Sequence, residues 1–467
     1  MNKINDQIIQ YDLIEYCDID KLKQNLVIPL NKQELFVQIA LYDKNIDISW
    51  MQNIFNMPIK IVIFSKEDIE FILNDIEYRV DIYKLVQNLF LQERFNNIDV
   101  NSFFDKLIEF AILKKSSDIH IETISDGLVI RFRIDGKLIQ ILKFGFGLYP
   151  IVSAIIKIVS NLDISMKRLP QNGRFSRKIG KDNYDFRVSI MPIMNGESIV
   201  IRILNQNHKI LNLNNIGLED KQILDIKESI FQTQGLILVT GPTGSGKTTT
   251  LYSILNEIND GYKKIVTLEE PVEYKISGIS QININDEIGL GYERVLKDIL
   301  RQDPDIIMIG EIRDSKTLHI ALQAALTGHL VLATLHTNDA ISTIDRLLEL
   351  DAIPYLVAST LNMIISQRLL RRLCENCKVK KGEYYIPKGC SRCNLSGYDS
   401  RFMVCEILKN DNFIRENIRI NYNSNSIYKY LINNSFKTMY DNGMYKVKLG
   451  YTSYDELNNN CKKYETV

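Results

Sequence analysis

A glycine-rich segment that follows a short apolar run constrains the fold of this chain more than any other feature. The run Gly235–Thr240 has the composition of a buried central strand, and residues 241–248 after it read Gly-Pro-Thr-Gly-Ser-Gly-Lys-Thr. Residues 249–255 then favour a helix. A strand, a glycine-rich loop and a helix in this order form the P-loop pattern. The pattern predicts a parallel α/β domain and a site for nucleotide phosphates.

Each part of this loop has a chemical task in phosphate binding. Glycine allows backbone N–H groups to curl around phosphate oxygens, and the N-terminus of the next helix adds partial positive charge. Lys247 is expected to reach the β- and γ-phosphates, and the hydroxyl of Thr248 is expected to bind Mg²⁺. We therefore predict ATP and Mg²⁺ as cofactors. The predicted nucleotide-binding residues are Gly241, Pro242, Thr243, Gly244, Ser245, Gly246, Lys247, Thr248 and Thr249.

A second apolar run ends in a carboxylate. Residues 305–311 read Asp-Ile-Ile-Met-Ile-Gly-Glu, which is the arrangement of a Walker B strand, although Gly310 stands where that motif usually has Asp. Glu311 is therefore expected to polarise the attacking water, and it is also a candidate for holding Mg²⁺ through water. The alternative is a glutamate that only caps the exit of a strand.

An acidic cluster follows the apolar pair Ile265–Val266. It contains Glu269, Glu270 and Glu273. Because the carboxyl ends of parallel strands meet at one edge of a sheet, these acids are expected near the γ-phosphate. Glu269 and Glu273 are the catalytic candidates among them, and which glutamate acts is left open. A solvated acidic loop is the alternative interpretation.

Two histidines flank the apolar run at residues 330–335. His329 and His336 are seven residues apart, so a regular strand would point them to opposite faces. His336, at the end of the strand, is the better candidate for sensing the γ-phosphate. His329 is interpreted as structural.

Taken together, these motifs resemble the secretion ATPases of type II secretion and type IV pilus assembly. The resemblance covers roughly residues 105–410. The stretches that carry it correspond, in order, to the family's Walker A, acidic box, Walker B and His box; they are 241–250, 267–274, 300–314 and 327–340. Shorter matches lie at 117–122, 168–174 and 185–189. Two positions depart from the family, because Glu270 stands for its usual Asp and Ser198 for a common Arg.

The resemblance implies an ATP-hydrolysing, RecA-like motor domain preceded by a PAS-like α/β domain. It further implies a homo-hexamer whose domain rotation powers assembly of a type II pseudopilus or a type IV pilus. Expected partners are an inner-membrane platform protein and a cytoplasmic adaptor. The family's catalytic arginines correspond to Arg187 and Arg202, with Arg174 as a weaker candidate. The alternative is that these are sheet-surface arginines paired with acids.

Four cysteines have the spacing C-x₂-C-x₁₂-C-x₂-C. Thiolates in two such pairs suit tetrahedral Zn²⁺ in a structural site, and a reducing cytoplasm favours metal over disulfides. The family has this element in assembly ATPases, usually with a longer loop, and lacks it in retraction ATPases. The predicted zinc ligands are Cys374, Cys377, Cys390 and Cys393.

The sequence pattern divides the chain into six parts. Within the first, Ser65 is expected to cap a helix over residues 66–73. Asp135-Gly136 is expected to close a hairpin in the second part. The parts are an N-terminal docking domain at 1–95, an α/β domain with the arginines at 96–205, a linker at 206–215, the ATPase domain at 216–370, the cysteine module at 371–400 and a helical region at 401–467.

Charge and hydropathy limit the alternatives. The chain has 57 basic and 57 acidic residues, so no overall positive field would recruit nucleic acid. No apolar run reaches the length of a membrane span, and no signal peptide is evident. We therefore expect a cytoplasmic protein that reaches the inner membrane only through partners. A pilus-retraction ATPase, a DNA-translocating motor of related fold and a non-catalytic scaffold are the rival functions, and the filament served is left open.

Overall fold

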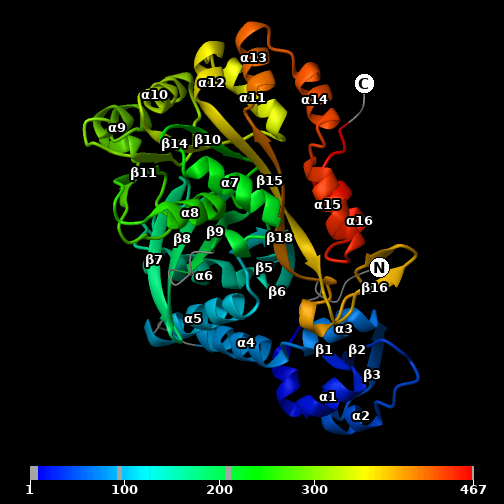
Figure 1. Cartoon of the computed structure of the whole chain (residues 1–467). Coiled ribbons are helices and arrows are strands. Elements are labelled where there is room, and N and C mark those ends of the chain that lie inside the picture. Colours follow the sequence, from blue (N-terminus) through cyan, green and yellow to red (C-terminus); the bar gives the residue numbers. More distant parts are fainter. Residues whose placement is uncertain (1–8, 92–96, 126, 206–211, 465–467) are drawn as a thin grey trace. The chain divides into compact units, whose positions relative to one another are not determined.

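The computed structural model describes residues 9–91, 97–125, 127–205 and 212–464, which divide into two compact units. The first unit contains the chain up to His208 together with Lys388–Gly397, and the second contains Lys209–Pro387 and Tyr398–Val467. Both units combine helices with sheets, which confirms the predicted α/β class (Figure 1). Among the described residues, none of the helices is long and apolar enough to span a bilayer.

The apolar side chains of the first unit form one large hydrophobic core. It includes buried residues from both sides of the boundary that the sequence pattern placed near residue 95. Tyr78 of α4 (Ile76–Leu91) stacks on Phe110 of α5 (Asn97–Leu113), with ring centroids 5.2 Å apart. The two expected N-terminal domains therefore share a core, because these helices bring their apolar faces together.

The smaller sheet of the first unit has three strands in the order β1-β2-β3. The first pair is antiparallel and the second is parallel. Ser65 caps α3 as expected, because its hydroxyl accepts a hydrogen bond from the backbone N–H of Asp68 at 3.1 Å. The elements are η2 (Tyr11–Tyr16), α1 (Ile19–Asn25), β1 (Ile28–Lys32), β2 (Val37–Leu41), α2 (Ser49–Phe55), β3 (Ile59–Ile63) and α3 (Lys66–Leu73).

The larger sheet of the first unit has six strands in the order β6-β5-β4-β9-β8-β7, and all neighbours are antiparallel. The hairpin between β5 and β6 turns at Asp135 and Gly136, whose φ angles are 47° and 82°. Two positive φ angles are what a tight two-residue turn requires. The elements are β4 (Asp118–Ile124), β5 (Gly127–Ile134), β6 (Lys137–Phe144), η3 (Phe146–Leu148), α6 (Tyr149–Val159), β7 (Gln171–Ile179), β8 (Asp182–Ile193) and β9 (Gly196–Asn205).

A seven-stranded sheet organises the second unit, in the order β12-β11-β13-β14-β10-β15-β18 (Figure 1). Every neighbouring pair is parallel except β15 and β18. The central strands β10 and β14 are buried at every residue, as expected for strands covered on both faces. The elements up to β14 are η4 (Leu213–Asn215), α7 (Asp220–Ile230), β10 (Gly235–Thr240), α8 (Lys247–Ile258), β11 (Ile265–Glu269), β12 (Ser280–Asn283), η5 (Asp286–Ile288), α9 (Tyr292–Ile299), β13 (Ile306–Ile309), α10 (Ser315–Leu326) and β14 (Leu330–Leu335).

The sheet continues past residue 370, where the sequence pattern placed the end of the ATPase domain. β15 runs to Leu373 and pairs with β18, which occupies the start of the expected helical region. Residues 206–211 of the expected linker lie outside the described residues. The remaining elements are α11 (Ala340–Glu349), α12 (Pro354–Thr360), β15 (Leu361–Leu373), β16 (Val379–Lys381), β17 (Tyr384–Ile386), η6 (Ser391–Cys393), β18 (Tyr398–Lys409), α13 (Asn412–Ile420), α14 (Ser424–Asn433), α15 (Met439–Lys448) and α16 (Tyr454–Asn460).

A buried glutamate on β18 holds the N-termini of two helices. Glu406 accepts hydrogen bonds from the backbone N–H of Ala340 at 2.7 Å and of Met439 at 2.8 Å, the first residues of α11 and α15. It also accepts one from the hydroxyl of Tyr464 at 3.0 Å. Burial raises the pKa of Glu406 to about 7, although these hydrogen bonds oppose the rise. The carboxylate thus connects the end of the chain to the helix that follows the His box.

Candidate active site

The glycine-rich loop adopts a conformation that only glycine tolerates well. Gly241, Gly244 and Gly246 have φ angles of 146°, 78° and 88°. A Cβ on Gly241 would also lie 2.5 Å from the carbonyl oxygen of Gln367. Lys247 begins α8, and its Nζ donates to the carbonyl oxygens of Gly241 at 2.8 Å and Pro242 at 3.2 Å. The lysine therefore lies along the loop that it is expected to serve.

The other predicted loop residues surround the same turn. Pro242, Thr243 and Thr248 are exposed, so the Thr248 hydroxyl at the start of α8 is accessible to a cation. Ser245 is buried, and Thr249 is half-buried, with its carbonyl oxygen accepting a hydrogen bond from Ser253 at 2.8 Å. The exposed face of the loop is the one that can meet a nucleotide.

Gln367, a residue that the sequence analysis missed, holds this loop through hydrogen bonds from the neighbouring strand β15. Gln367 on β15 is fully buried, and its Nε2 donates to the carbonyl oxygen of Ser245 at 2.8 Å. Its Oε1 accepts a hydrogen bond from the Thr250 hydroxyl, also at 2.8 Å. One amide thereby joins the glycine-rich loop and helix α8 to β15. The register that brings β15 beside β10 is a long-range pairing for which the sequence carried no local signal.

Lys247 and Glu311 act on each other electrostatically. Burial lowers the pKa of Lys247, the charge of Glu311 opposes that change, and Arg368 adds to it. Arg368 also reaches the His-box segment, because its Nη2 donates to the carbonyl oxygen of Asn338 at 2.9 Å. The P-loop lysine, the Walker B glutamate and the His box follow the carboxyl ends of β10, β13 and β14, which are neighbours in the sheet order β13-β14-β10.

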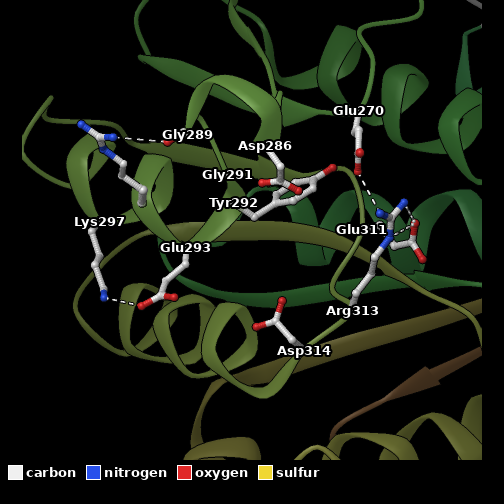
Figure 2. A pocket seen from close by; sticks show the side chains of 11 residues that line it. Glu270, Asp286, Gly289, Gly291, Tyr292, Glu293, Lys297, Glu311, Arg313 and Asp314 are labelled. Atoms are coloured by element: carbon white, nitrogen blue, oxygen red, sulfur yellow. Dashed lines mark hydrogen bonds and ion pairs between the residues drawn. The ribbon is translucent and has the colours of Figure 1, made fainter. Parts of the chain in front are cut away.

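Glu311 lies between a histidine and an arginine. Nε2 of His336 is 3.1 Å from Oε1 of Glu311. Nε and Nη2 of Arg313 lie 3.0 and 2.9 Å from Oε2 of the same carboxylate. Nη1 of Arg313 donates to Oε2 of Glu270 at 2.9 Å, so Figure 2 shows one guanidinium between two carboxylates. The structure thus brings together His336 and Glu311, which the sequence analysis selected, and adds Arg313, which it did not.

The unusual glycine of the Walker B segment has a steric explanation. A Cβ on Gly310 would lie 3.0 Å from the carbonyl oxygen of Leu268 and 3.2 Å from the hydroxyl of Tyr292. Thr334 fixes the same position, because its hydroxyl donates to the carbonyl oxygen of Gly310 at 2.6 Å. A side chain at residue 310 would therefore require the Leu268 carbonyl group or the phenol of Tyr292 to shift by a few tenths of an ångström.

A cavity of about 590 Å³ adjoins these carboxylates. It lies on the side of α9, and the labelled side chains of Figure 2 surround it. Burial raises the pKa of Tyr292, and the charge of Glu270 raises it further. Five acidic and three basic side chains contribute to the lining, namely Glu270, Asp286, Glu293, Glu311 and Asp314 with Arg294, Lys297 and Arg313.

The three glutamates of the acidic box have different surroundings. Glu269 is 3% exposed, and it accepts hydrogen bonds from the hydroxyls of Tyr252 and Thr267, the latter at 2.6 Å. Glu273 is half-buried, and its backbone N–H donates to the Tyr252 hydroxyl at 3.4 Å. Glu270 is the member that Arg313 links to Glu311. Glu269 thus belongs to a separate buried network that joins β11 to α8.

His329 lies at the other end of β14. Its Nδ1 is 3.0 Å from the carbonyl oxygen of Ala324, near the end of α10. The contact completes the hydrogen bonding of a helix terminus, in line with the structural role expected for this histidine.

The arginines of the first unit form a row across its larger sheet. Arg174 is paired with Arg187, and Arg187 with Arg202, on the adjacent strands β7, β8 and β9. Arg202 also contacts Asp118 on β4, with Nε 3.1 Å from Oδ1. Like charges opposite one another on neighbouring strands are unfavourable, and Asp118 offsets part of this charge at Arg202.

The four predicted zinc ligands lie together. One sulfur from each of Cys374, Cys377, Cys390 and Cys393 falls within 4.8 Å of the others. The sulfurs of Cys390 and Cys393 are 3.7 Å apart, close to the roughly 3.8 Å edge of a tetrahedron with Zn–S bonds of about 2.3 Å. The backbone N–H of Gly397 donates to the sulfur of Cys393 at 3.2 Å, a contact that stabilises a thiolate. The donor set and its spacing fit a structural zinc ion.

Comparison with known proteins agrees with this geometry. The chain is 40% identical over 407 residues to the putative type II secretion system protein E of Escherichia coli (strain K12), covering 83% of this chain and 82% of that protein. It is 40% identical over 368 residues to the type IV pilus assembly ATPase PilB of Myxococcus xanthus (strain DK1622), covering 74% of this chain and 65% of that one.

A solved structure and a family profile extend the comparison. The crystal structure of the pilus retraction motor PilT with bound ADP aligns with a TM-score of 0.56 at 28% identity, covering 77% of this chain and 96% of that one. The profile of the family described as "Type II/IV secretion system protein" matches residues 94–459. The chain belongs to the type II/IV secretion system protein family, an ATPase family, as its motifs predicted.

Proposed function

We propose that this chain hydrolyses ATP to drive the assembly of a type II secretion pseudopilus or a type IV pilus. The observation that carries the proposal is the contact of His336 with Glu311 at the edge of the parallel sheet where the P-loop strand β10 also ends. The relatives named as a type II secretion protein E and as PilB support the choice of machine. The four-cysteine cluster favours assembly over retraction, following the family resemblance.

The chemistry follows from the residues at this edge. The backbone of 241–247 and the N-terminus of α8 would hold the phosphates, and Lys247 would neutralise charge between the β- and γ-positions. Thr248 offers the hydroxyl that would hold Mg²⁺, which supplies charge neutralisation when bound. Glu311 would orient the attacking water and accept its proton. His336 would meanwhile contact Oε1 of the Glu311 carboxylate. In this proposal Glu311 acts on the attacking water, and Lys247 acts on the negative charge of the phosphates.

Among the acidic-box glutamates, the contacts favour Glu270 as the one that acts at the nucleotide. Its carboxylate is about one-third exposed and is linked to Glu311 through Arg313. The carboxylate of Glu269 is occupied by buried hydroxyl donors, which suits a supporting role for that residue. Glu273, which is half-buried in the same loop, is the second candidate for acting at the nucleotide.

We further propose that Arg187 and Arg202 act on nucleotide phosphates in a homo-hexamer whose units rotate during the ATP cycle. Three arginines lie in register on neighbouring strands, and a polyphosphate carries the negative charge that such a set would bind. Arg202 would have to exchange its contact with Asp118 for the phosphate. The same proposal includes two fold assignments, a RecA-like fold for the motor and a PAS-like fold for the preceding domain. It also includes recruitment to the inner membrane through a platform protein and an adaptor.

The cysteine cluster is proposed to bind one structural Zn²⁺. All four positions of a tetrahedral ion would be filled by sulfur, so no position is left for catalysis. The hydrogen bonds from Gly397 and from the backbone N–H of Cys390 to the Cys393 sulfur are of the kind that orient metal ligands.

The decisive experiment measures phosphate release and ADP binding by the full-length protein and three variants. Lys247→Ala is expected to abolish nucleotide binding. Glu311→Gln is expected to bind ADP normally and to lower the turnover number by about 100- to 10,000-fold, the contribution of a general base. Glu293→Gln is the matched control, because Glu293 lines the same cavity but pairs with Lys297 at 2.7 Å. Normal turnover in Glu311→Gln would refute the assignment.

A further inference from the structure

Arg313 connects the ends of two neighbouring strands of the motor sheet. It follows β13 by a few residues, and its guanidinium contacts Glu311 of its own segment and Glu270 at the end of β11. The three nitrogens of the planar group are all engaged, at 2.9 to 3.0 Å, with carboxylate oxygens. Figure 2 shows the guanidinium lying between the two carboxylates, and all three side chains line the cavity. A lysine could not hold both partners in this way, because its single ammonium is a point charge without a fork.

These contacts divide the two oxygens of Glu311 between different tasks. A carboxylate oxygen has two acceptor positions. Within the described part of the chain, Oε2 of Glu311 meets two nitrogens of Arg313, whereas Oε1 meets only Nε2 of His336. One acceptor position of Oε1 therefore stays open beside the His336 ring. This is the position at which Glu311 can receive a hydrogen bond from water.

We propose that Arg313 is a positioning residue for hydrolysis. It occupies Oε2 of Glu311, turns Oε1 toward the attacking water and fixes the distance between Glu311 and Glu270. The inference rests on the proposed function of Glu311 as the base. It assigns Arg313 no contact with the nucleotide, so its effect belongs to turnover rather than to binding.

The exposure of Arg313 separates this role from a structural one. Its side chain is 56% exposed, and ion pairs in such a position contribute little to the stability of a fold. The orientation of a base, in contrast, affects the rate strongly, because a displacement of about 1 Å can cost a factor of roughly 100. Loss of Arg313 should therefore slow turnover without unfolding the protein.

The test uses the full-length protein with substitutions at Arg313. Arg313→Gln is expected to lower the turnover number roughly ten- to hundredfold, with the ADP dissociation constant and the KM for ATP unchanged within about twofold. Arg313→Lys is expected to recover only part of the rate. Arg294→Gln is the matched control with full activity, since Arg294 lines the same cavity but donates to the carbonyl oxygen of Gly289 at 3.3 Å.

Two further measurements distinguish positioning from a general loss of structure. Free guanidinium at millimolar concentration should restore part of the turnover of Arg313→Ala and none of that of Glu311→Gln. Glu270→Gln should slow the wild-type protein, and its combination with Arg313→Gln should slow turnover by less than the product of the two single effects, because both changes break the same link. Turnover of Arg313→Gln within twofold of wild type, weakened ADP binding, or fully multiplicative effects with Glu270→Gln would each overturn the proposal. A wild-type protein without turnover would instead refute the proposed function itself.

Discussion

Replacing Gln367 by leucine tests whether the P-loop depends on its support from β15. The substitution keeps the size of the side chain and removes one hydrogen-bond donor and one acceptor from a fully buried position. The carbonyl oxygen of Ser245 loses its partner, and the Thr250 hydroxyl keeps longer contacts with the carbonyl oxygen of Gly246 at 3.4 Å and the sulfur of Met403 at 3.7 Å. A lost buried hydrogen bond costs about 1 kcal/mol and an orphaned polar group about 1–3 kcal/mol. We therefore expect the free energy of unfolding of the second unit to fall by about 2–4 kcal/mol.

The assay is urea unfolding with two probes. Trp50 is the single tryptophan and lies in the first unit, so its fluorescence reports that unit. Circular dichroism reports the unfolding of both units. In Gln367→Leu, the unfolding midpoint of the second unit should shift to a lower urea concentration, and that of the first unit should stay the same. Gln323→Leu is the matched control, because Gln323 is exposed on α10 and should change stability by less than about 0.5 kcal/mol. ADP affinity should also weaken in Gln367→Leu, since the loop backbone is less well held.

Two outcomes would contradict this reasoning. Unfolding of Gln367→Leu that coincides with that of the wild type would show that the amide contributes nothing to the loop. Thr250→Val removes one of the same hydrogen bonds, so its effect combined with Gln367→Leu must be smaller than the sum of the two single effects. Strict additivity would place the two residues in separate networks.

Two further predictions concern the cysteine cluster and the buried carboxylate of β18. Cys393→Ser should lower the zinc content from about one ion per chain and should destabilise the fold; absence of zinc from the wild-type protein, measured by metal analysis, would rule the site out. Because the pKa of Glu406 is raised from 4.5 to about 7, its protonated form favours the fold. Stability should fall as pH rises from about 4.5 to 7, by on the order of 3 kcal/mol. Urea unfolding of Glu406→Gln should lack this part of the pH dependence, and an unchanged slope would exclude Glu406 as its source.

The buried strands of the motor sheet could be predicted from the sequence almost residue by residue. β10 and β14 were both expected at the bounds that the structure has, because a strand covered on both faces is an unbroken apolar run. The start of β2 (Val37–Leu41) is harder to place from the sequence, because the apolar residue Leu35 precedes the strand and is 77% exposed. A single apolar residue just before a strand carries little information about where that strand begins.

The candidate site was predictable wherever one local motif supplies the chemistry. Lys247 and Glu311 each occupy a fixed position in a motif that follows a strand. The spacing of the four cysteines is sufficient to predict a metal site. Gln367 and Arg313 could not be found in this way, because their partners come from distant segments that only the order of the strands brings close. The separation of Glu269 from Glu270 has the same origin, since adjacent residues at the end of β11 enter different environments.

The hydrogen bond between Tyr252 and Glu269 joins helix α8 to strand β11, two elements that would lie at different parts of a bound nucleotide. Tyr252 lies five residues after Lys247 on α8, about 7.5 Å along the helix axis. The hydrogen bond therefore joins the helix that begins at Lys247 to the last residue of β11, and the next residue is Glu270. The spacing between Lys247 and the acidic box is thus held by a helix, a side-chain hydrogen bond and a strand rather than by a loop alone.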